Sequence, residues 1–161
     1  MSETEKATDN AAQANASTEA PKTRETFQNS PEDAKYLLAE DNSVNQKLFN
    51  ILFDRMQLHR QTAWNGQEAV DMYKANPERC RLILLDTSMP VMGGQEASLL
   101  IRQYEKENGL QPAIIVGMIA YSVGDGESDK KRLQDKFGMD TALSKPVRPQ
   151  QLQELIDNYP V

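Results

Sequence analysis

From Lys35 onward, short apolar runs alternate with longer stretches in which apolar residues recur at helical spacing. The short runs predict strands over residues 36–39, 60–63, 82–85, 114–119 and 142–143. The longer stretches predict helices that begin after the cap signal Asn42-Ser43 and then span residues 66–75, 95–107, 128–137 and 149–158. Strands and helices that alternate in this way are typical of a parallel sheet with helices on both faces.

Five strands and five helices joined by right-handed crossovers predict a flavodoxin-like, doubly wound α/β fold with strand order 2-1-3-4-5. We assign this fold to residues 34–161 as one domain. Gly138 stands directly after the fourth predicted helix, at a position where glycine commonly ends a helix.

Residues 1–33 differ from the rest of the chain in composition. They are rich in Ala, Thr, Glu, Asn and Ser, and Phe27 is the one aromatic residue among them. Such a segment cannot bury enough apolar surface to offset the entropy of ordering, so we expect a disordered N-terminal tail or linker. It lacks the apolar centre of a signal peptide and is too acidic for a transit peptide.

The formal charge is -6 over 161 residues, and residues 1–33 contribute three basic and seven acidic side chains to it. No basic stripe remains to neutralise phosphates, so we expect no nucleic-acid partner. No apolar stretch approaches bilayer length, so we expect no membrane contact by this chain. The single Cys80 excludes an intramolecular disulfide and fits a reducing, cytoplasmic setting. We expect a monomer in which Cys80 is semi-buried and unreactive.

Charged residues follow three of the predicted strands. Glu40 and Asp41 come after the first strand, Asp86 ends the third, and Lys145 comes after the fifth. Because the carboxyl ends of parallel strands meet at one edge of a sheet, these three carboxylates and one ammonium should converge. Such a cluster suits a hard divalent cation with oxygen ligands, beside a carboxylate that can act as a nucleophile.

Each of these residues also has a simpler explanation. Glu40 and Asp41 precede a helix and could serve only its dipole, Asp86 could cap a turn, and Lys145 could be an ordinary exposed lysine. Their joint occurrence at three strand ends favours a functional site. The one histidine, His59, opens the second strand away from this edge, and we expect it to be structural.

Three segments resemble response-regulator receiver domains: Ala-Glu-Asp-Asn-Ser-Val-Asn-Gln at 39–46, Leu-Asp-Thr-Ser-Met-Pro-Val-Met-Gly-Gly at 85–94, and Leu-Ser-Lys-Pro at 143–146. The likeness covers residues 35–161. The first segment and the Met-Pro-Val-Met turn are similar to receivers of hybrid histidine kinases, which work in phosphorelays.

The resemblance implies that Asp86 is a phosphoacceptor and that Mg²⁺ is the cofactor. Asp86 and Asp41 would be direct metal ligands, Glu40 a ligand through water, and the backbone carbonyl of Ser88 a further ligand. Lys145 would place a compact positive charge on a phosphoryl oxygen. The donor would be a phosphohistidine on a histidine kinase or a histidine phosphotransfer protein. Such a module catalyses only its own phosphorylation and dephosphorylation.

The sequence departs from the receiver pattern at the conformational switch. Receivers usually carry Thr or Ser at the end of the fourth strand and an aromatic residue or histidine three residues before the lysine. Ile119 and Ala142 occupy these positions here, and Ser122 could supply the hydroxyl only if the loop folded back. Gly93, where many relatives have an acidic residue, is expected to loosen the loop beside Asp86.

Two functions therefore remain open. The first is a phosphoacceptor module with an atypical switch, and the second is a pseudo-receiver that binds proteins without being phosphorylated. A haloacid-dehalogenase-like phosphatase fits less well, because Ser88 stands where that family has a second acid. A nucleotide-binding module fits least, because no glycine-rich phosphate loop follows the first strand.

Overall fold

The computed structural model describes residues 27–120 and 126–161. Its sheet contains five parallel strands: β2 (Tyr36–Ala39), β3 (Arg60–Ala63), β4 (Leu82–Asp86), β5 (Ile114–Ile119) and β6 (Thr141–Ser144). The spatial order is β3-β2-β4-β5-β6, which is the predicted order 2-1-3-4-5. The flavodoxin-like fold is therefore confirmed.

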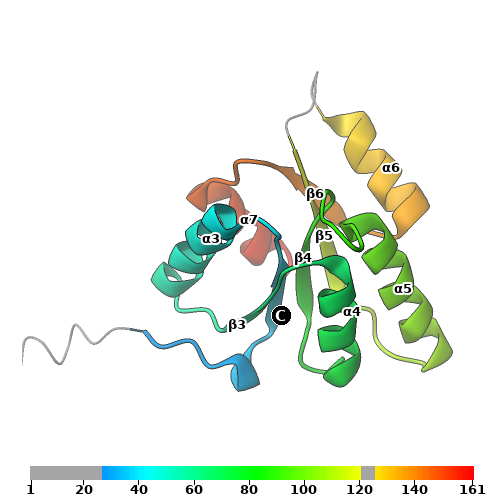
Figure 1. The fold of residues 1–161 in the computed structure, drawn as a ribbon, viewed down its shortest axis with the longest axis horizontal. Helices are drawn as coiled ribbons and strands as arrows, with labels where there is room; N and C mark the ends of the chain where they lie inside the picture. The colour runs from blue at the N-terminus through cyan, green and yellow to red at the C-terminus, as the bar shows by residue number, and fades with distance from the viewer. Residues whose placement is uncertain (1–26, 121–125) are drawn as a thin grey trace, which may run out of the picture.

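Five helices cover the two faces of this sheet: α3 (Ser43–Arg55), α4 (Gly66–Ala75), α5 (Gly94–Glu107), α6 (Glu127–Phe137) and α7 (Pro149–Asn158). Helices α3 and α7 lie on one face, and α4, α5 and α6 lie on the other (Figure 1). Within residues 27–120 and 126–161, no helix is long and apolar enough to cross a membrane.

Both faces of the central strands β2 and β4 are buried, which explains why their sequences are continuous apolar runs. In β4, Leu82 and Leu84 pack toward α3 and α7, while Ile83 and Leu85 pack toward α4 and α5. Phe53 of α3 points into the core on the α3 and α7 face of the sheet and is fully inaccessible to solvent.

The helix ends agree with the signals in the sequence. Asn42 caps α3, because its Oδ1 accepts a hydrogen bond from the Asn45 N–H at 2.9 Å. Gly138 ends α6 in the left-handed conformation with φ of 70°, as its position predicted. The Asn42 cap starts α3 immediately after Glu40 and Asp41, and so fixes these two acids at the carboxyl edge of the sheet.

The expected tail boundary at Asp33 differs from the structure. Residues 27–33 lie against β3, and a short 3-10 helix, η1 (Pro31–Asp33), precedes β2. Asn29 Nδ2 donates to the Arg60 carbonyl at 2.9 Å, and Asn29 Oδ1 accepts from the Arg60 N–H at 2.8 Å. Paired hydrogen bonds of this kind order a segment whose composition alone suggests disorder.

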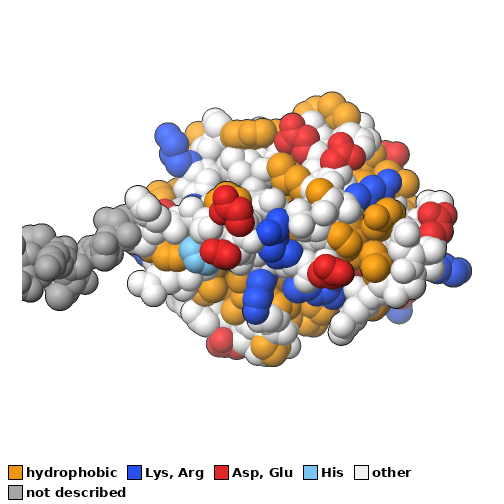
Figure 2. Space-filling view, turned by 90° about the horizontal axis from the view of Figure 1, so that it is seen from below, with side chains coloured by type: hydrophobic (Ala, Val, Ile, Leu, Met, Phe, Trp, Pro, Cys, Tyr) orange, Lys and Arg blue, Asp and Glu red, His pale blue; other side chains and the backbone are white. Residues whose placement is uncertain are grey.

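His59 and Cys80, the one histidine and the one cysteine, both lie in packed surroundings. His59 Nδ1 accepts the Ser30 N–H at 2.9 Å, and the imidazole packs against Phe27 with ring centroids 4.8 Å apart and ring planes tilted by 35°. Cys80 is buried rather than semi-buried, and burial raises the pKa of its thiol. Neither residue lies among the charged groups at the carboxyl edge of the sheet. On the face drawn in Figure 2, acidic and basic side chains are interspersed.

Candidate functional site

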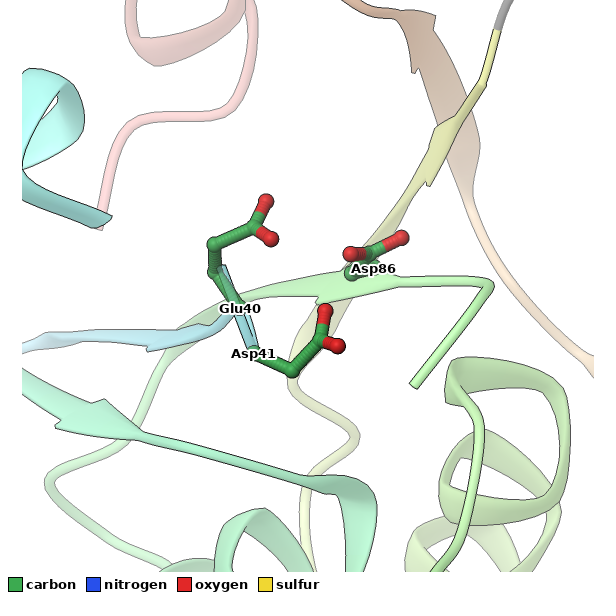
Figure 3. A group of neighbouring side chains, drawn as sticks. All are labelled: Glu40, Asp41 and Asp86. Atoms are coloured by element: carbon green, nitrogen blue, oxygen red, sulfur yellow. The ribbon is translucent and has the colours of Figure 1, made fainter. Parts of the chain in front are cut away.

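Three acidic side chains meet where β2 and β4 end. Glu40 and Asp41 follow β2, Asp86 is the last residue of β4, and one carboxylate oxygen from each lies within 4.8 Å of the others. Figure 3 shows the three carboxylates gathered at the neighbouring ends of these strands. Glu40 and Asp86 are buried, whereas Asp41 is exposed. The predicted convergence of the acids is confirmed by this geometry.

Lys145 brings its ammonium to the same cluster. Its Nζ lies 2.9 Å from Asp86 Oδ2 and 3.0 Å from Glu40 Oε1, so one cation lies between two buried carboxylates. The Lys145 side chain is 21% exposed. It follows β6, which is paired to β5, and the Lys145 N–H donates to the Ile119 carbonyl at 2.8 Å.

Backbone amides hold the remaining carboxylate oxygens. The Ser88 N–H donates to Asp86 Oδ1 at 3.0 Å, and the Asn42 N–H donates to Glu40 Oε2 at 3.1 Å. Gln46 of α3 is also buried and donates from Nε2 to the carbonyls of Glu40 and Ala63, at 3.1 and 3.2 Å. Gln46 thereby joins the ends of β2 and β3 beneath the site.

The ionisable groups influence one another strongly. Burial raises the pKa of the Glu40 carboxyl above its ordinary value, although Lys145 and the Asn42 N–H act in the opposite direction. Burial alone would lower the pKa of the Lys145 ammonium, but its close contacts with the Asp86 and Glu40 carboxylates outweigh this and raise it. The Lys145 cation is therefore stabilised by the acids it contacts.

The donor set fits a hard divalent cation. Three carboxylates offer oxygen ligands, and Asp41 faces solvent, where an ion could enter. Glu40 Oε1 is buried and has no aligned hydrogen-bond partner, although Lys145 Nζ lies close to it. That oxygen retains the capacity to accept a hydrogen bond from a metal-bound water, which is the role predicted for Glu40.

The loop after β4 is anchored to the start of α4. The Gly66 N–H donates to the Met92 carbonyl at 2.8 Å, and a Cβ on Gly66 would lie 2.4 Å from that oxygen. Gly93 has an ordinary extended conformation, and a Cβ there would lie 2.9 Å from the Thr87 carbonyl. Both glycines are thus in close contact with the backbone of neighbouring segments, and the loosening expected from Gly93 stays a prediction.

The two departures from the switch pattern lie on neighbouring strands. Ile119 ends β5 and Ala142 lies in β6, and both are half-buried against the core under α5 and α6. Ala142 pairs with Gly117, over which Met139 Sδ and Leu133 Cδ1 occupy the space that a side chain would need. Ser122, the alternative hydroxyl considered from the sequence, lies outside the described residues.

Sequence reasoning overlooked Thr87, which follows Asp86 directly. Its Oγ1 donates to the Met118 carbonyl at 3.2 Å, and it lines a small cavity together with Ile119. A hydroxyl residue next to the proposed nucleophile was the signal that could have identified it.

Comparisons with known proteins identify relatives for most of the chain. Residues 36–157 match the family model described as the response regulator receiver domain. The chain is 32% identical over 126 residues to hybrid signal transduction histidine kinase I of Dictyostelium discoideum, covering 76% of this chain and 7% of that protein. It is 35% identical over 97 residues to the response regulator SSK1 of Cochliobolus heterostrophus, covering 60% of this chain and 11% of the relative. The chain therefore spans a small part of the length of these relatives.

Solved structures give the same result. The receiver domain of Saccharomyces cerevisiae Ssk1, solved with the histidine phosphotransfer protein Ypd1, matches with a TM-score of 0.70 and 31% identity, over 79% of this chain and 88% of that one. The receiver domain of the Pseudomonas aeruginosa sensor histidine kinase PA1611 was solved with a magnesium ion coordinated in its active site cleft. It matches with a TM-score of 0.64 and 24% identity, over 78% of this chain and 97% of that one, which supports the fold alone.

Proposed function

Because this chain belongs to the response regulator receiver domain family, we propose that it accepts a phosphoryl group on Asp86 from a phosphohistidine. The observation that carries the proposal is the position of Lys145 Nζ, which lies 2.9 Å from the Asp86 carboxylate inside a cluster of three acids. A buried carboxylate with both an ammonium and a metal-type ligand set beside it is arranged for phosphoryl transfer.

In the proposed step, an Asp86 oxygen forms a bond to phosphorus while the bond from phosphorus to the donor imidazole nitrogen breaks. The electron pair of that bond stays with the imidazole, which leaves as a neutral ring once protonated. Lys145 is placed to stabilise negative charge on a phosphoryl oxygen, and the Ser88 N–H lies on the other carboxylate oxygen of Asp86 at 3.0 Å.

Glu40, Asp41, Asp86 and the Ser88 carbonyl are the residues that we propose hold Mg²⁺. When bound, the ion supplies positive charge that neutralises the approach of one anion to another. Glu40 would contribute through water, because its buried Oε1 contacts Lys145 Nζ without an aligned hydrogen bond, and the exposed Asp41 would bind directly.

We propose that the donor, a histidine kinase or a histidine phosphotransfer protein, docks on α3. Val44, Leu48 and Ile51 on this helix are exposed by 63%, 56% and 45%. Beside them runs a shallow groove that reaches Lys145 and is lined by Asn45, Leu48, Phe49, Leu52, Lys145, Pro146 and Val147. An apolar surface that ends at the reactive edge would position a partner helix carrying the phosphohistidine.

The missing switch residues make the proposed output unusual. Ile119 has no hydroxyl that could donate a hydrogen bond to a phosphoryl oxygen, and Ala142 has no ring that could move inward. Met139 and Leu133 already fill the space over Gly117, the strand neighbour of Ala142. A phosphoryl group can shift a conformational equilibrium only through a difference in interaction energy between two states, and little difference is available here.

The proposal is tested by incubating the chain with Mg²⁺ and acetyl phosphate and measuring its intact mass. We expect one phosphoryl adduct that depends on Mg²⁺, that is absent in Asp86→Asn, and that forms more slowly in Lys145→Ala. Glu68→Gln, which changes a carboxylate away from the acid cluster, serves as the control and should be modified normally. An adduct that persists undiminished in Asp86→Asn would contradict the assignment.

A pseudo-receiver that is not phosphorylated in use is the second candidate, and the observation in its favour is the loss of switch chemistry at Ile119 and Ala142. The two candidates differ in one measurable respect. A phosphoacceptor takes the phosphoryl group from a phosphorylated histidine phosphotransfer protein, whereas a pseudo-receiver binds that protein and leaves its phosphohistidine intact.

A further inference from the structure

We propose that the hydroxyl of Thr87 becomes a hydrogen-bond donor to the phosphoryl group on Asp86. This inference rests on the proposed phosphoacceptor function and adds a phosphoryl-binding residue to it. Thr87 is adjacent to Asp86 in the chain, and it lies beside Ile119 at the carboxyl edge, because Asp86 and Met118 are paired in the sheet.

The present hydrogen bond of the Thr87 hydroxyl is weak. Oγ1 lies 3.2 Å from the Met118 carbonyl oxygen, which is longer than the roughly 2.5–3.0 Å typical of a hydroxyl donor. A phosphoryl oxygen is charged and offers a shorter, stronger hydrogen bond than a neutral carbonyl does. Exchange of one acceptor for the other therefore favours the phosphorylated state.

The carbonyl that loses the hydroxyl stays satisfied. The Thr87 N–H also donates to the Met118 oxygen, at 3.0 Å, and this backbone bond need not change when the side chain rotates. No buried acceptor is left without a partner, so the exchange avoids the penalty that normally opposes breaking a buried hydrogen bond.

One oxygen of a phosphoryl group on Asp86 is left for a further donor. Of its three terminal oxygens, Lys145 can bind one and the proposed cation another. Ile119, which ends β5 and lines a small cavity together with Thr87, has no hydroxyl and cannot donate. Thr87 is half-buried on the same small cavity, so its hydroxyl is both accessible and close to the chain segment that carries Asp86.

A donor on the residue next to the nucleophile has a specific consequence. Rotation about the Thr87 side-chain bond moves one hydroxyl and leaves the backbone pairing of β4 and β5 unchanged. Thr87 would then stabilise phospho-Asp86 without pulling on β5 or α6, which agrees with a module that stores a phosphoryl group without a large switch.

The test compares Thr87→Val, which keeps the shape and removes the hydroxyl, with Thr87→Ser, which keeps the hydroxyl. The measurements are the half-life of phospho-Asp86 formed from acetyl phosphate, the affinity for beryllofluoride in the presence of Mg²⁺, and the affinity for Mg²⁺ alone. We expect Thr87→Val to shorten the half-life and weaken beryllofluoride binding roughly tenfold, with Thr87→Ser within about twofold of the unmodified chain. Affinity for Mg²⁺ alone should be the same in all three.

The outcomes separate this inference from the proposed function. If the unmodified chain forms no adduct and binds no beryllofluoride, the phosphoacceptor function itself fails. If the adduct forms and Thr87→Val behaves like the unmodified chain, the Thr87 inference is overturned. Should Thr87→Val not fold, the unmodified chain still decides: beryllofluoride should shift the Met118 carbonyl ¹³C resonance upfield as the hydroxyl leaves it, and an unmoved resonance would reject the inference.

Discussion

Replacing Lys145 by alanine removes the ammonium that lies between Glu40 and Asp86, and two opposite effects should follow. Without Mg²⁺, two buried carboxylates lose the cation that contacts both of them, at 3.0 and 2.9 Å. With Mg²⁺, the same acids bind the ion without a competing positive charge. We therefore expect a variant that is less stable alone and that binds Mg²⁺ more tightly.

The structure sets the size of both effects. Removing one partner of a buried ion pair costs roughly 3–5 kcal/mol, and the 21% exposure of the Lys145 side chain places this site near or below the lower limit. A unit charge and a divalent ion about 5 Å apart repel each other by about 1.7 kcal/mol even at the dielectric constant of water. Loss of that repulsion corresponds to a gain in Mg²⁺ affinity of at least roughly tenfold.

Urea unfolding with a chelator present measures the first effect. Fluorescence of Trp64, the one tryptophan, measures the second, because Trp64 is 47% exposed directly after β3 at the carboxyl edge. Lys131→Ala is the matched control, since Lys131 forms an exposed ion pair with Asp135 and its loss should change stability by about 1 kcal/mol or less. Unchanged Mg²⁺ affinity together with unchanged stability in Lys145→Ala would refute the electrostatic reasoning.

Three further outcomes are expected. In Gly66→Ala, the new Cβ would lie 2.4 Å from the Met92 carbonyl oxygen and would displace the loop after Asp86. The free energy of unfolding should fall by roughly 1–3 kcal/mol, and Mg²⁺ should bind more weakly. Urea unfolding measures the first effect and Mg²⁺ titration the second. Phe53→Ala should lower the free energy of unfolding, measured in urea, by roughly 3–5 kcal/mol, because the Phe53 side chain of α3 is fully buried. The fraction of the chain that stays folded should still bind Mg²⁺. Beryllofluoride with Mg²⁺ should shift the NMR resonances of Ser88 and Lys145 while leaving those of α6 nearly unchanged; concerted shifts across α6 and β6 would show that a switch survives.

The elements of the fold could be predicted because each carries a local signal. The buried strands are apolar on both faces, Asn42 accepts the cap hydrogen bond expected of it, and Gly138 adopts the expected left-handed conformation. The convergence of Glu40, Asp41, Asp86 and Lys145 followed from topology, because parallel strands present their carboxyl ends together.

What the sequence did not predict depends on contacts between distant segments. The hydrogen bonds between Asn29 and Arg60 join two residues that no periodicity connects. The sequence therefore placed the end of the tail at residue 33, after residues that contact β3 in the structure. The anchoring of the loop after β4 depends on the close approach of Gly66 to Met92, which no local pattern encodes. The surroundings of the Thr87 hydroxyl depend on the Met118 carbonyl of the neighbouring strand, which no local pattern encodes.

The hydrogen bonds of Asn29 also cover part of the outer edge of the sheet. β3 is an edge strand of the sheet, and its outer side would otherwise present unpaired peptide groups to another molecule. The Asn29 amide supplies one donor and one acceptor to Arg60, so a side chain imitates the peptide group of an additional strand. A shortened chain that begins at Ala34 would keep all five strands and all five helices but would lose this cover, and it should precipitate more readily than a chain that begins before Phe27.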